Sequence, residues 1–224
     1  MSNNRSPMRI ANGEFDTSQK CIQLPLPSVT LGPVTNDDFE LLSKWASSKS
    51  WVYAGGSRQY LNAEAFRKIA ENGRDNFLMV IDRDGRSIGA VTWRSGQYPA
   101  SFEIGTMIGD PARWQIGYGI ESVLAIIGQL FDTKHAHRVE FVCGVFNKPA
   151  IQACCSGLIH IEGVLRDYYY FDGTHHDAII GSILRAEYYS MVRPRETVPK
   201  AERDESRHIL DEYLRTNPIA LREE

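Results

Sequence analysis

The run Trp114-Gln-Ile-Gly-Tyr-Gly-Ile-Glu-Ser122 decides how this chain is interpreted. It follows a strand-like segment, Phe102 to Ile108, and precedes a segment in which apolar residues recur at helical spacing. Two glycines at such a junction remove the side chains that would keep a ligand from the backbone. The first N–H groups of a helix have no partner inside it, and the helix dipole adds partial positive charge there. The run therefore predicts either an anion site, most often for a phosphate, or a glycine-rich turn that only begins a helix.

Two common phosphate motifs do not fit the run. A Walker loop requires a Lys directly after its second Gly, and none stands there. A dinucleotide fingerprint requires a third Gly where this chain has Ser122, and the preceding strand ends several residues too early. What remains is a pyrophosphate cradle of another kind.

The longer run Ile108 to Ser122 resembles the acyl-CoA pyrophosphate loop of GNAT-superfamily N-acetyltransferases, which reads roughly Arg/Gln-x-x-Gly-x-Gly/Ala. Trp114 in the first place and Glu121 after the second small residue are similar to the branch that contains the ribosomal-protein-alanine N-acetyltransferases (RimJ/RimL-like). Later segments resemble that branch's N-x-x-S, E-G-x-x-R and G-x-x-x-D motifs in the same order: Asn147 to Ala150, Glu162 to Arg166 and Gly173 to Asp177. The resemblance implies a GNAT acyltransferase domain over residues 29–190.

The resemblance also implies that acetyl-CoA is the acyl donor and that no metal is needed. Amides around the glycines would hold the pyrophosphate, and the strand before them would pair with the pantetheine arm and polarise the thioester carbonyl. Asn147 would bond the pantetheine, with plain capping of the next helix as the alternative. The expected donor-binding residues are Thr106, Met107, Ile108, Gln115, Ile116, Gly117, Tyr118, Gly119, Ile120 and Asn147.

Acyl transfer to an amine requires a neutral nucleophile, and a free alkyl amine has a pKa near ~10, so a base or a water relay must take a proton. Glu103 is the candidate, because its strand leads to the glycine run and the family often has a catalytic carboxylate on that strand; an ordinary solvent-facing Glu is the alternative. Family members commonly carry a Tyr about seven residues after the Asn to protonate the leaving thiolate, but this chain has Cys154. We expect Cys154 to be a small buried residue, because nothing near it in sequence marks it as activated.

The resemblance implies that the acceptor pocket is formed by the loop from Tyr168 to His176 and by the loop from Lys49 to Leu61, between the first two helices. Trp51, Tyr53 and Tyr60 would form its wall there, unless these aromatic residues belong to the core. The acceptor would be a primary amine of a small molecule or of a protein N-terminus, attacked directly in a ternary complex. Two other classes remain open: a CoA-binding protein with little catalysis, and a transferase with another acyl donor such as aminoacyl-tRNA.

The wider pattern favours a mixed fold. Strands are expected near residues 29–34, 77–81, 88–93, 102–108, 139–145, 165–171 and 178–184. Helices are expected after Thr35, after Asn62, after the glycine run and from about Lys148. Strands that first form a hairpin and are then separated by helices predict an α/β (α+β) fold with a mixed sheet. The resemblance implies the GNAT fold: a mostly antiparallel central sheet, flanked by helices and splayed at the acyl-CoA site.

The two ends of the chain are expected to lie outside this core. Residues 1–28 are polar and contain Pro25 and Pro27, which predicts a loosely ordered N-terminal segment. Residues 191–224 are expected to form a linker and an amphipathic helix from Arg203 to Arg215. Its apolar stripe would dock on its own domain, which we favour, or on a second subunit, so the protein would be a monomer or a homodimer.

Composition narrows the class of partner. A net charge of -3 and a pI near 6.1 give no electrostatic footprint for nucleic acid, so tRNA enters only with the aminoacyl-tRNA alternative. No apolar run approaches the length of a membrane span, and residues 1–20 lack the apolar core of a signal peptide. The four cysteines lack zinc-ribbon spacing, which favours free thiols in a reducing compartment. We therefore expect a cytoplasmic protein without a metal site or a membrane partner.

Overall fold

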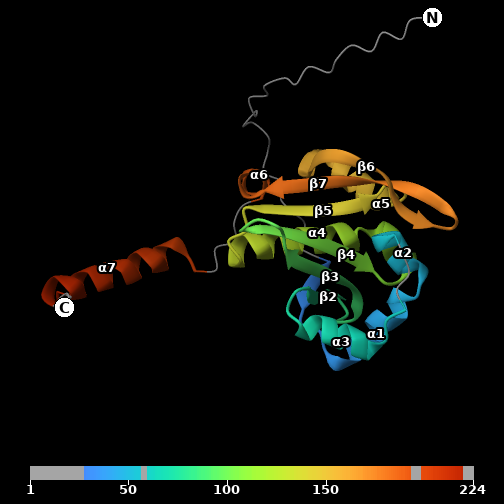
Figure 1. Cartoon of the computed structure of the whole chain (residues 1–224). Coiled ribbons are helices and arrows are strands. Elements are labelled where there is room, and N and C mark those ends of the chain that lie inside the picture. Colours follow the sequence, from blue (N-terminus) through green and yellow to red (C-terminus); the bar gives the residue numbers. More distant parts are fainter. Residues whose placement is uncertain (1–27, 57–59, 193–197, 219–224) are drawn as a thin grey trace, which may run out of the picture.

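The computed structural model describes residues 28–56, 60–192 and 198–218. Its centre is a seven-stranded sheet with the strand order β1-β2-β3-β4-β5-β7-β6 (Figure 1). The strands are β1 (Val29–Gly32), β2 (Asn76–Asp82), β3 (Ser87–Ser95), β4 (Ser101–Ile108), β5 (Arg138–Gly144), β6 (His160–Phe171) and β7 (Thr174–Leu184). Every neighbouring pair is antiparallel except β4 and β5, which are parallel. The predicted mixed, mostly antiparallel sheet is confirmed.

Helices cover both faces of this sheet (Figure 1). On one face, Phe131 of α4 packs against strand residues such as Val139. On the other face, Phe66 of α3 packs with Met79 and with residues of α1. These helices are α1 (Asn36–Ala46), α3 (Ala63–Glu71) and α4 (Tyr118–Thr133). As predicted, Thr35 begins α1 in a capping box, in which its N–H donates to Asp38 Oδ2 at 2.8 Å.

The sheet opens between its two parallel strands. β4 and β5 pair only where Ser101–Glu103 lie beside Arg138–Glu140. Beyond these residues β4 remains paired with β3, and β5 remains paired with β7, but the two strands no longer pair with each other. The unpaired edges of two central strands therefore face each other across a split, which is the predicted splay.

In the described part of the chain, four short helical segments were not predicted, among them α6 (Arg185–Met191), after β7, and the π-helix η2 (Cys154–Leu158), which follows α5. The other two lie earlier in the chain. α2 (Lys49–Gly55) occupies the segment that we expected to be a loop; Ser48 Oγ caps it by accepting from the N–H of Ser50, and Gly56 ends it with φ +77°. A 3-10 helix, η1 (Pro111–Ile116), lies between β4 and the glycines, so the glycine run does not follow the strand directly. These segments are short enough that hydrophobic periodicity does not reveal them.

β6 begins at His160, earlier than the predicted start near Leu165, and it contains two bulges. The register against β7 places Glu162 as an extra residue between Ile161 and Gly163, and shifts again between Leu165 and Tyr169. The second bulge contains Asp167, which has φ +52° and whose N–H donates to Asp177 Oδ1 at 2.8 Å. The Asp of the G-x-x-x-D motif therefore stabilises a bulge in the neighbouring strand.

The C-terminal helix α7 (Lys200–Thr216) forms where a helix was predicted and extends away from the sheet (Figure 1). None of its residues is buried, and Ile209, Leu210 and Tyr213 of its apolar stripe are exposed. The docking on its own domain that we favoured is therefore not observed. No described helix combines the length and the apolar character needed to cross a membrane. The predicted loosely ordered segment, residues 1–28, lies outside the described residues except for Ser28.

Candidate active site

The split between β4 and β5 opens into a cavity of about 270 Å³. Both strand edges line it, together with the first turns of α4, with α2 and with α5 (Lys148–Ala153). Because α4 and α2 pack on opposite faces of the sheet, the cavity joins the two faces. None of the lining residues is an Asp, Glu, Lys, Arg or His. The cavity suits an uncharged, elongated group that passes between the strands.

The two glycines at the start of α4 differ in what they provide. Gly117 is the N-cap and has φ +98°, a conformation that favours glycine. At Gly119 a Cβ would meet only Ile108 Cγ1, at 3.8 Å, so this residue leaves open space in the cavity wall. The N–H groups of Ile120 and Glu121 both donate to the Gly117 carbonyl at 3.1 Å, which leaves the preceding N–H groups to face a ligand. The N-terminal end of α4 thus has the geometry of an anion site.

Trp114 and Glu121, which flank the glycines, hold this run in place. The Glu121 carboxylate accepts from the N–H and the Oγ of Ser28, at 2.6 and 3.0 Å, and so ties α4 to the start of β1. Trp114 Nε1 donates to the Ile108 carbonyl at 2.9 Å, and its ring stacks on Tyr53 with 4.2 Å between centroids. The Ile108 carbonyl, which we expected to face the pantetheine arm, is therefore already an acceptor within the protein.

Most of the predicted donor-binding residues meet at the cavity. Its lining includes Thr106, Met107, Ile108, Gly117, Gly119, Ile120 and Asn147. Ile116 is 58% exposed and Tyr118 packs against the core, and neither lines the cavity. The side chain of Gln115 lies outside what the structure describes. The structure thus brings together the glycines, the β4 edge and the Asn, although they lie far apart in sequence.

Asn147 caps α5 and also contacts α2. Its Oδ1 accepts from the N–H of Ala150 at 3.3 Å, and its Nδ2 donates to the Tyr53 carbonyl at 3.3 Å. Both ends of the amide are therefore used within the protein, and the side chain spans from α5 to α2 beside the cavity. Of the two roles predicted for Asn147, capping of the next helix is the one that its contact with Ala150 shows.

Glu103 lies at the last paired position before the split. Arg94 Nε donates to Glu103 Oε2 at 2.7 Å, and this hydrogen bond raises the pKa of the Arg94 guanidinium. Because side chains alternate along a strand, Glu103 shares a face with Gly105, which lines the cavity. Glu103 therefore lies two residues from the cavity on the same strand face and is not one of the residues that line it.

Of the three aromatic residues expected in the acceptor wall, only Tyr53 lines the cavity. Trp51 packs edge-on against Phe66 at 5.7 Å between centroids, within the α1–α3 core. Tyr60 is 82% exposed and does not reach the cavity. The helical geometry of α2 explains the difference between Trp51 and Tyr53, because residues two apart on a helix point in different directions.

Two thiols lie in the cavity wall, Cys143 and Cys154, and both are buried. Burial raises the pKa of Cys143 to about 12 and that of Cys154 to about 11. Both thiols are therefore protonated at neutral pH and are poor nucleophiles. The buried position predicted for Cys154 is confirmed.

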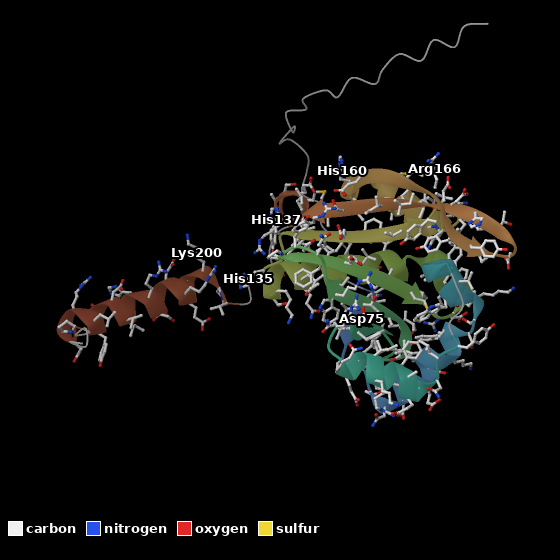
Figure 2. All side chains as sticks on the ribbon, viewed as in Figure 1. Asp75, His135, His137, His160, Arg166 and Lys200 are labelled. Atoms are coloured by element: carbon white, nitrogen blue, oxygen red, sulfur yellow. The ribbon has the colours of Figure 1, made fainter. Side chains whose placement is uncertain are left out.

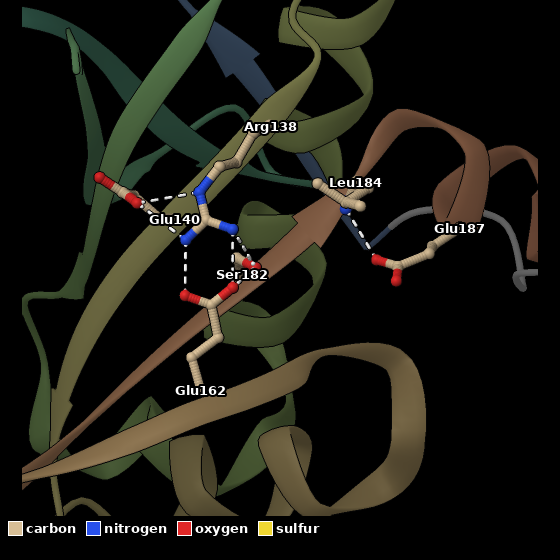
Figure 3. A network of polar contacts seen from close by, with 6 residues as sticks. All are labelled: Arg138, Glu140, Glu162, Ser182, Leu184 and Glu187. Atoms are coloured by element: carbon tan, nitrogen blue, oxygen red, sulfur yellow. Dashed lines mark hydrogen bonds and ion pairs between the residues drawn. The ribbon is translucent and has the colours of Figure 1, made fainter. Parts of the chain in front are cut away.

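Sequence reasoning missed the role of Glu162, the Glu of the E-G-x-x-R motif (Figure 3). Arg138 donates to both carboxylate oxygens, at 2.7 and 2.6 Å, and Ser182 Oγ donates at 2.7 Å. The hydrogen bonds from Arg138 are the largest cause that lowers the pKa of Glu162 to about 2. Arg138 also pairs with Glu140, so the network joins β5, β7 and β6. No local pattern could have identified Arg138 as the partner, because 24 residues separate the pair.

The described histidines do not form a metal site. His135 and His137 lie near the end of α4, whereas His160 lies on β6 (Figure 2). Within residues 28–56, 60–192 and 198–218, no group of three or more His, Cys, Asp or Glu side chains is arranged to hold a metal ion.

A mixed sheet that is split between parallel strands, with a cavity leading to a glycine-capped helix, is the architecture of an acyl-CoA-dependent acyltransferase. The family described as an acetyltransferase (GNAT) domain matches residues 28–154, which is more than half of the chain. The chain therefore belongs to the GNAT acetyltransferase family, and its class is that of an acyltransferase enzyme. No protein with curated annotation matches the sequence.

Solved structures share the fold at low sequence identity. The spermidine N-acetyltransferase from Vibrio cholerae, in complex with CoA and spermine, is 16% identical with a TM-score of 0.64; the match covers 72% of this chain and 98% of that chain. A spermidine N-acetyltransferase SpeG chimera from Vibrio cholerae and hSSAT is 16% identical with a TM-score of 0.63, at the same coverage. At this identity the likeness shows the fold.

Proposed function

We propose that the protein transfers an acetyl group from acetyl-CoA to a primary amine by direct attack in a ternary complex. The observation that carries this proposal is the uncharged cavity at the β4–β5 split, which α4 lines from one face of the sheet and α2 from the other. Donor and acceptor could enter from opposite faces and meet at the strand edges, in the orientation that a direct attack requires. The Vibrio cholerae structure with CoA and spermine supports this pairing of a CoA donor with an amine acceptor.

On the donor side, the backbone at Gly117 and Gly119 would hold the pyrophosphate at the positive end of the α4 dipole. The pantetheine arm would follow the β4 edge from Thr106 to Ile108, where the strand has no partner on its β5 side. A backbone N–H on this edge would stabilise the oxyanion of the tetrahedral intermediate. Asn147 would position Tyr53 and the start of α5, since its amide is already used by these elements.

On the acceptor side, Glu103 would act as the base or orient a water that takes the proton. Its place next to the cavity, on the same strand face as Gly105, supports a relay through water. The departing CoA thiolate needs little help, because a thiol with a pKa near ~8.5 is a tolerable leaving group at neutral pH. Cys154 would remain a protonated wall residue throughout.

We also propose that the chain belongs to the RimJ/RimL-like branch, and that residues 29–190 form the acyltransferase unit. Support comes from Trp114, Glu121, Glu162 and Asp177, each of which has a structural partner in the fold. These motif residues stabilise the glycine run and the β6 bulges. They therefore favour a branch of the family without specifying the acceptor.

A matched pair of variants at Gly119 tests the donor site. Gly119→Glu should abolish the thermal protection that CoA gives, because its carboxylate would occupy the anion site. The fold should survive, because an acidic residue in the first turn suits the helix dipole. Gly119→Ala should retain most of the protection, since its Cβ has room. If CoA protects Gly119→Glu as well as it protects the native chain, the proposed site is wrong.

Activity is measured as thiol release from acetyl-CoA in the presence of a panel of amines. Release that depends on an amine supports the transferase. CoA protection without release from any amine would favour the CoA-binding protein, and the absence of CoA protection would favour another donor.

A further inference from the structure

A cluster of aromatic side chains stands beside the α2 side of the cavity. Tyr53 and Trp114 line the cavity and stack on each other. Behind them, Phe146 lies 6.3 Å from the Tyr53 ring and 4.8 Å from the Phe171 ring. The aromatic wall, as we call this cluster, comprises Tyr53, Trp114, Phe146, Tyr169, Phe171 and His176.

The wall is held in place by contacts between distant segments. Tyr169 of β6 packs on Gly56 so closely that a Cβ on the glycine would lie 1.8 Å from the Tyr169 ring. His176 of β7 stacks on Phe171 with 4.1 Å between centroids. The β6–β7 hairpin is thereby fixed against the end of α2, so the wall is preformed and need not be ordered by a ligand.

No carboxylate lines the cavity, so none is available within its lining for a substrate cation. The cavity lining contains no ionisable acid or base apart from thiols and a phenol. On the β4 face that Gly105 shares, the Glu103 carboxylate is already paired with Arg94. A polyamine would have to bring further ammonium groups into this uncharged cavity, whose lining holds no carboxylate to pair with them, which is costly.

An acceptor with a single amino group next to an aromatic body avoids the cost of burying further charges. Its body gains from burial against the aromatic wall. Its ammonium group loses solvation, which lowers its pKa and favours the neutral form that attacks the thioester. The uncharged cavity would therefore assist deprotonation for this class of acceptor.

We propose that the acceptor is a monoamine whose amino group is attached to an aromatic or bulky apolar body, and that polyamines are poor substrates. This inference rests on the proposed function and adds the substrate class. It separates the chain from the Vibrio cholerae spermidine N-acetyltransferase, which has been solved in complex with CoA and spermine. Tyr53 is the residue we expect to contact the aromatic body, because it belongs to the aromatic wall and also lines the cavity.

The test compares kcat/KM for 2-phenylethylamine and for spermidine, with acetyl-CoA as donor and the full chain as enzyme. We expect a ratio of at least tenfold in favour of 2-phenylethylamine. Tyr53→Leu should lower this ratio at least fivefold, whereas Tyr53→Phe, which keeps the ring, should preserve it. Tyr98→Leu is the surface control, since Tyr98 is 70% exposed, and should leave the ratio unchanged.

CoA protection against heat is measured on every variant, so the two proposals can fail separately. If CoA does not protect the native chain, the proposed function fails. If CoA protects and spermidine is preferred, or only peptide N-termini are acetylated, the proposed function stands and this inference is overturned. A preference for 2-phenylethylamine that Tyr53→Leu leaves intact would overturn the assignment of the aromatic wall.

Discussion

The two sides of the cavity are built in different ways. The proposed donor side depends on one continuous run, in which Gly117 sets the backbone, Glu121 anchors the helix and Trp114 donates a hydrogen bond to the end of β4. The proposed acceptor side joins α2, the segment after β5 and the β6–β7 hairpin through contacts between Tyr53, Phe146 and Phe171. A donor held by backbone groups constrains the local sequence, whereas an acceptor held by side chains from several segments leaves each segment free to vary.

Among the variants that test the two sides of the cavity, the largest loss of activity is expected at Glu103. Glu103→Gln should lower kcat/KM by roughly one hundred-fold, within the usual range for a general base, while CoA protection stays unchanged. Arg94→Gln removes the same ion pair but keeps the carboxylate, so it should retain most of the activity. Equal losses in both variants would indicate a structural ion pair, and a loss below about threefold in Glu103→Gln would assign the base elsewhere.

A smaller effect is expected from the network that supports the hairpin half of the sheet. Glu162→Gln should lower the free energy of unfolding at pH 7 by about 1–2 kcal/mol, because charged hydrogen bonds to Arg138 are weakened and the site is partly exposed. The increment in Tm that CoA gives should remain, since the donor side is separate. Glu71→Gln, at the exposed end of α3, is the matched control.

The pH dependence of this effect has a definite sign. The pKa of Glu162 is lowered to about 2 in the folded protein from an ordinary value of 4.5. Its carboxylate therefore stabilises the fold fully above about pH 4.5, and this stabilisation is lost as the pH falls towards 2. Native chain and Glu162→Gln should converge in stability over that window, and a difference that persists at pH 2 would contradict the assignment.

Cys154 should matter less than either residue. Its protonated thiol forms part of the cavity wall, so Cys154→Ala should keep more than about a tenth of the native activity, well short of the ~10²–10⁴ loss expected for an essential acid. Thiol release at saturating acetyl-CoA provides the measurement. A thousand-fold loss with CoA protection intact would show that the thiol takes part in the chemistry.

The smallest change is expected at His176. Its Nε2 is buried and has no hydrogen-bond partner among the described residues, while its ring stacks on Phe171. His176→Phe keeps the stacking and removes the unpaired nitrogen, so Tm should stay the same or rise. A fall of more than about 5 °C would show that the nitrogen has a partner that stabilises the fold.

The sequence predicted the sheet well because the signals for its strands are local. Alternation and apolar runs located each strand, and Thr35 and Asn62 marked the helix starts that the structure shows. α2 was missed although Ser48 and Gly56 carry cap signals, because seven residues are too few to show a periodic apolar face. The bulges in β6 were missed because they depend on pairing with β7.

By itself, the sequence determined the family resemblance and the glycine-capped start of α4, since a glycine with positive φ, a helix start and the residues that flank them all lie within one short run. Tertiary structure alone decided the rest of the site: it paired Glu103 with Arg94, placed Tyr53 at the cavity and Trp51 in the core, and bound Glu162 to Arg138. The physical reason is the sequence separation over which each kind of interaction acts. Backbone conformation and capping depend on neighbours within a few residues, whereas ion pairs, ring contacts and strand register depend on segments that only the folded sheet brings together.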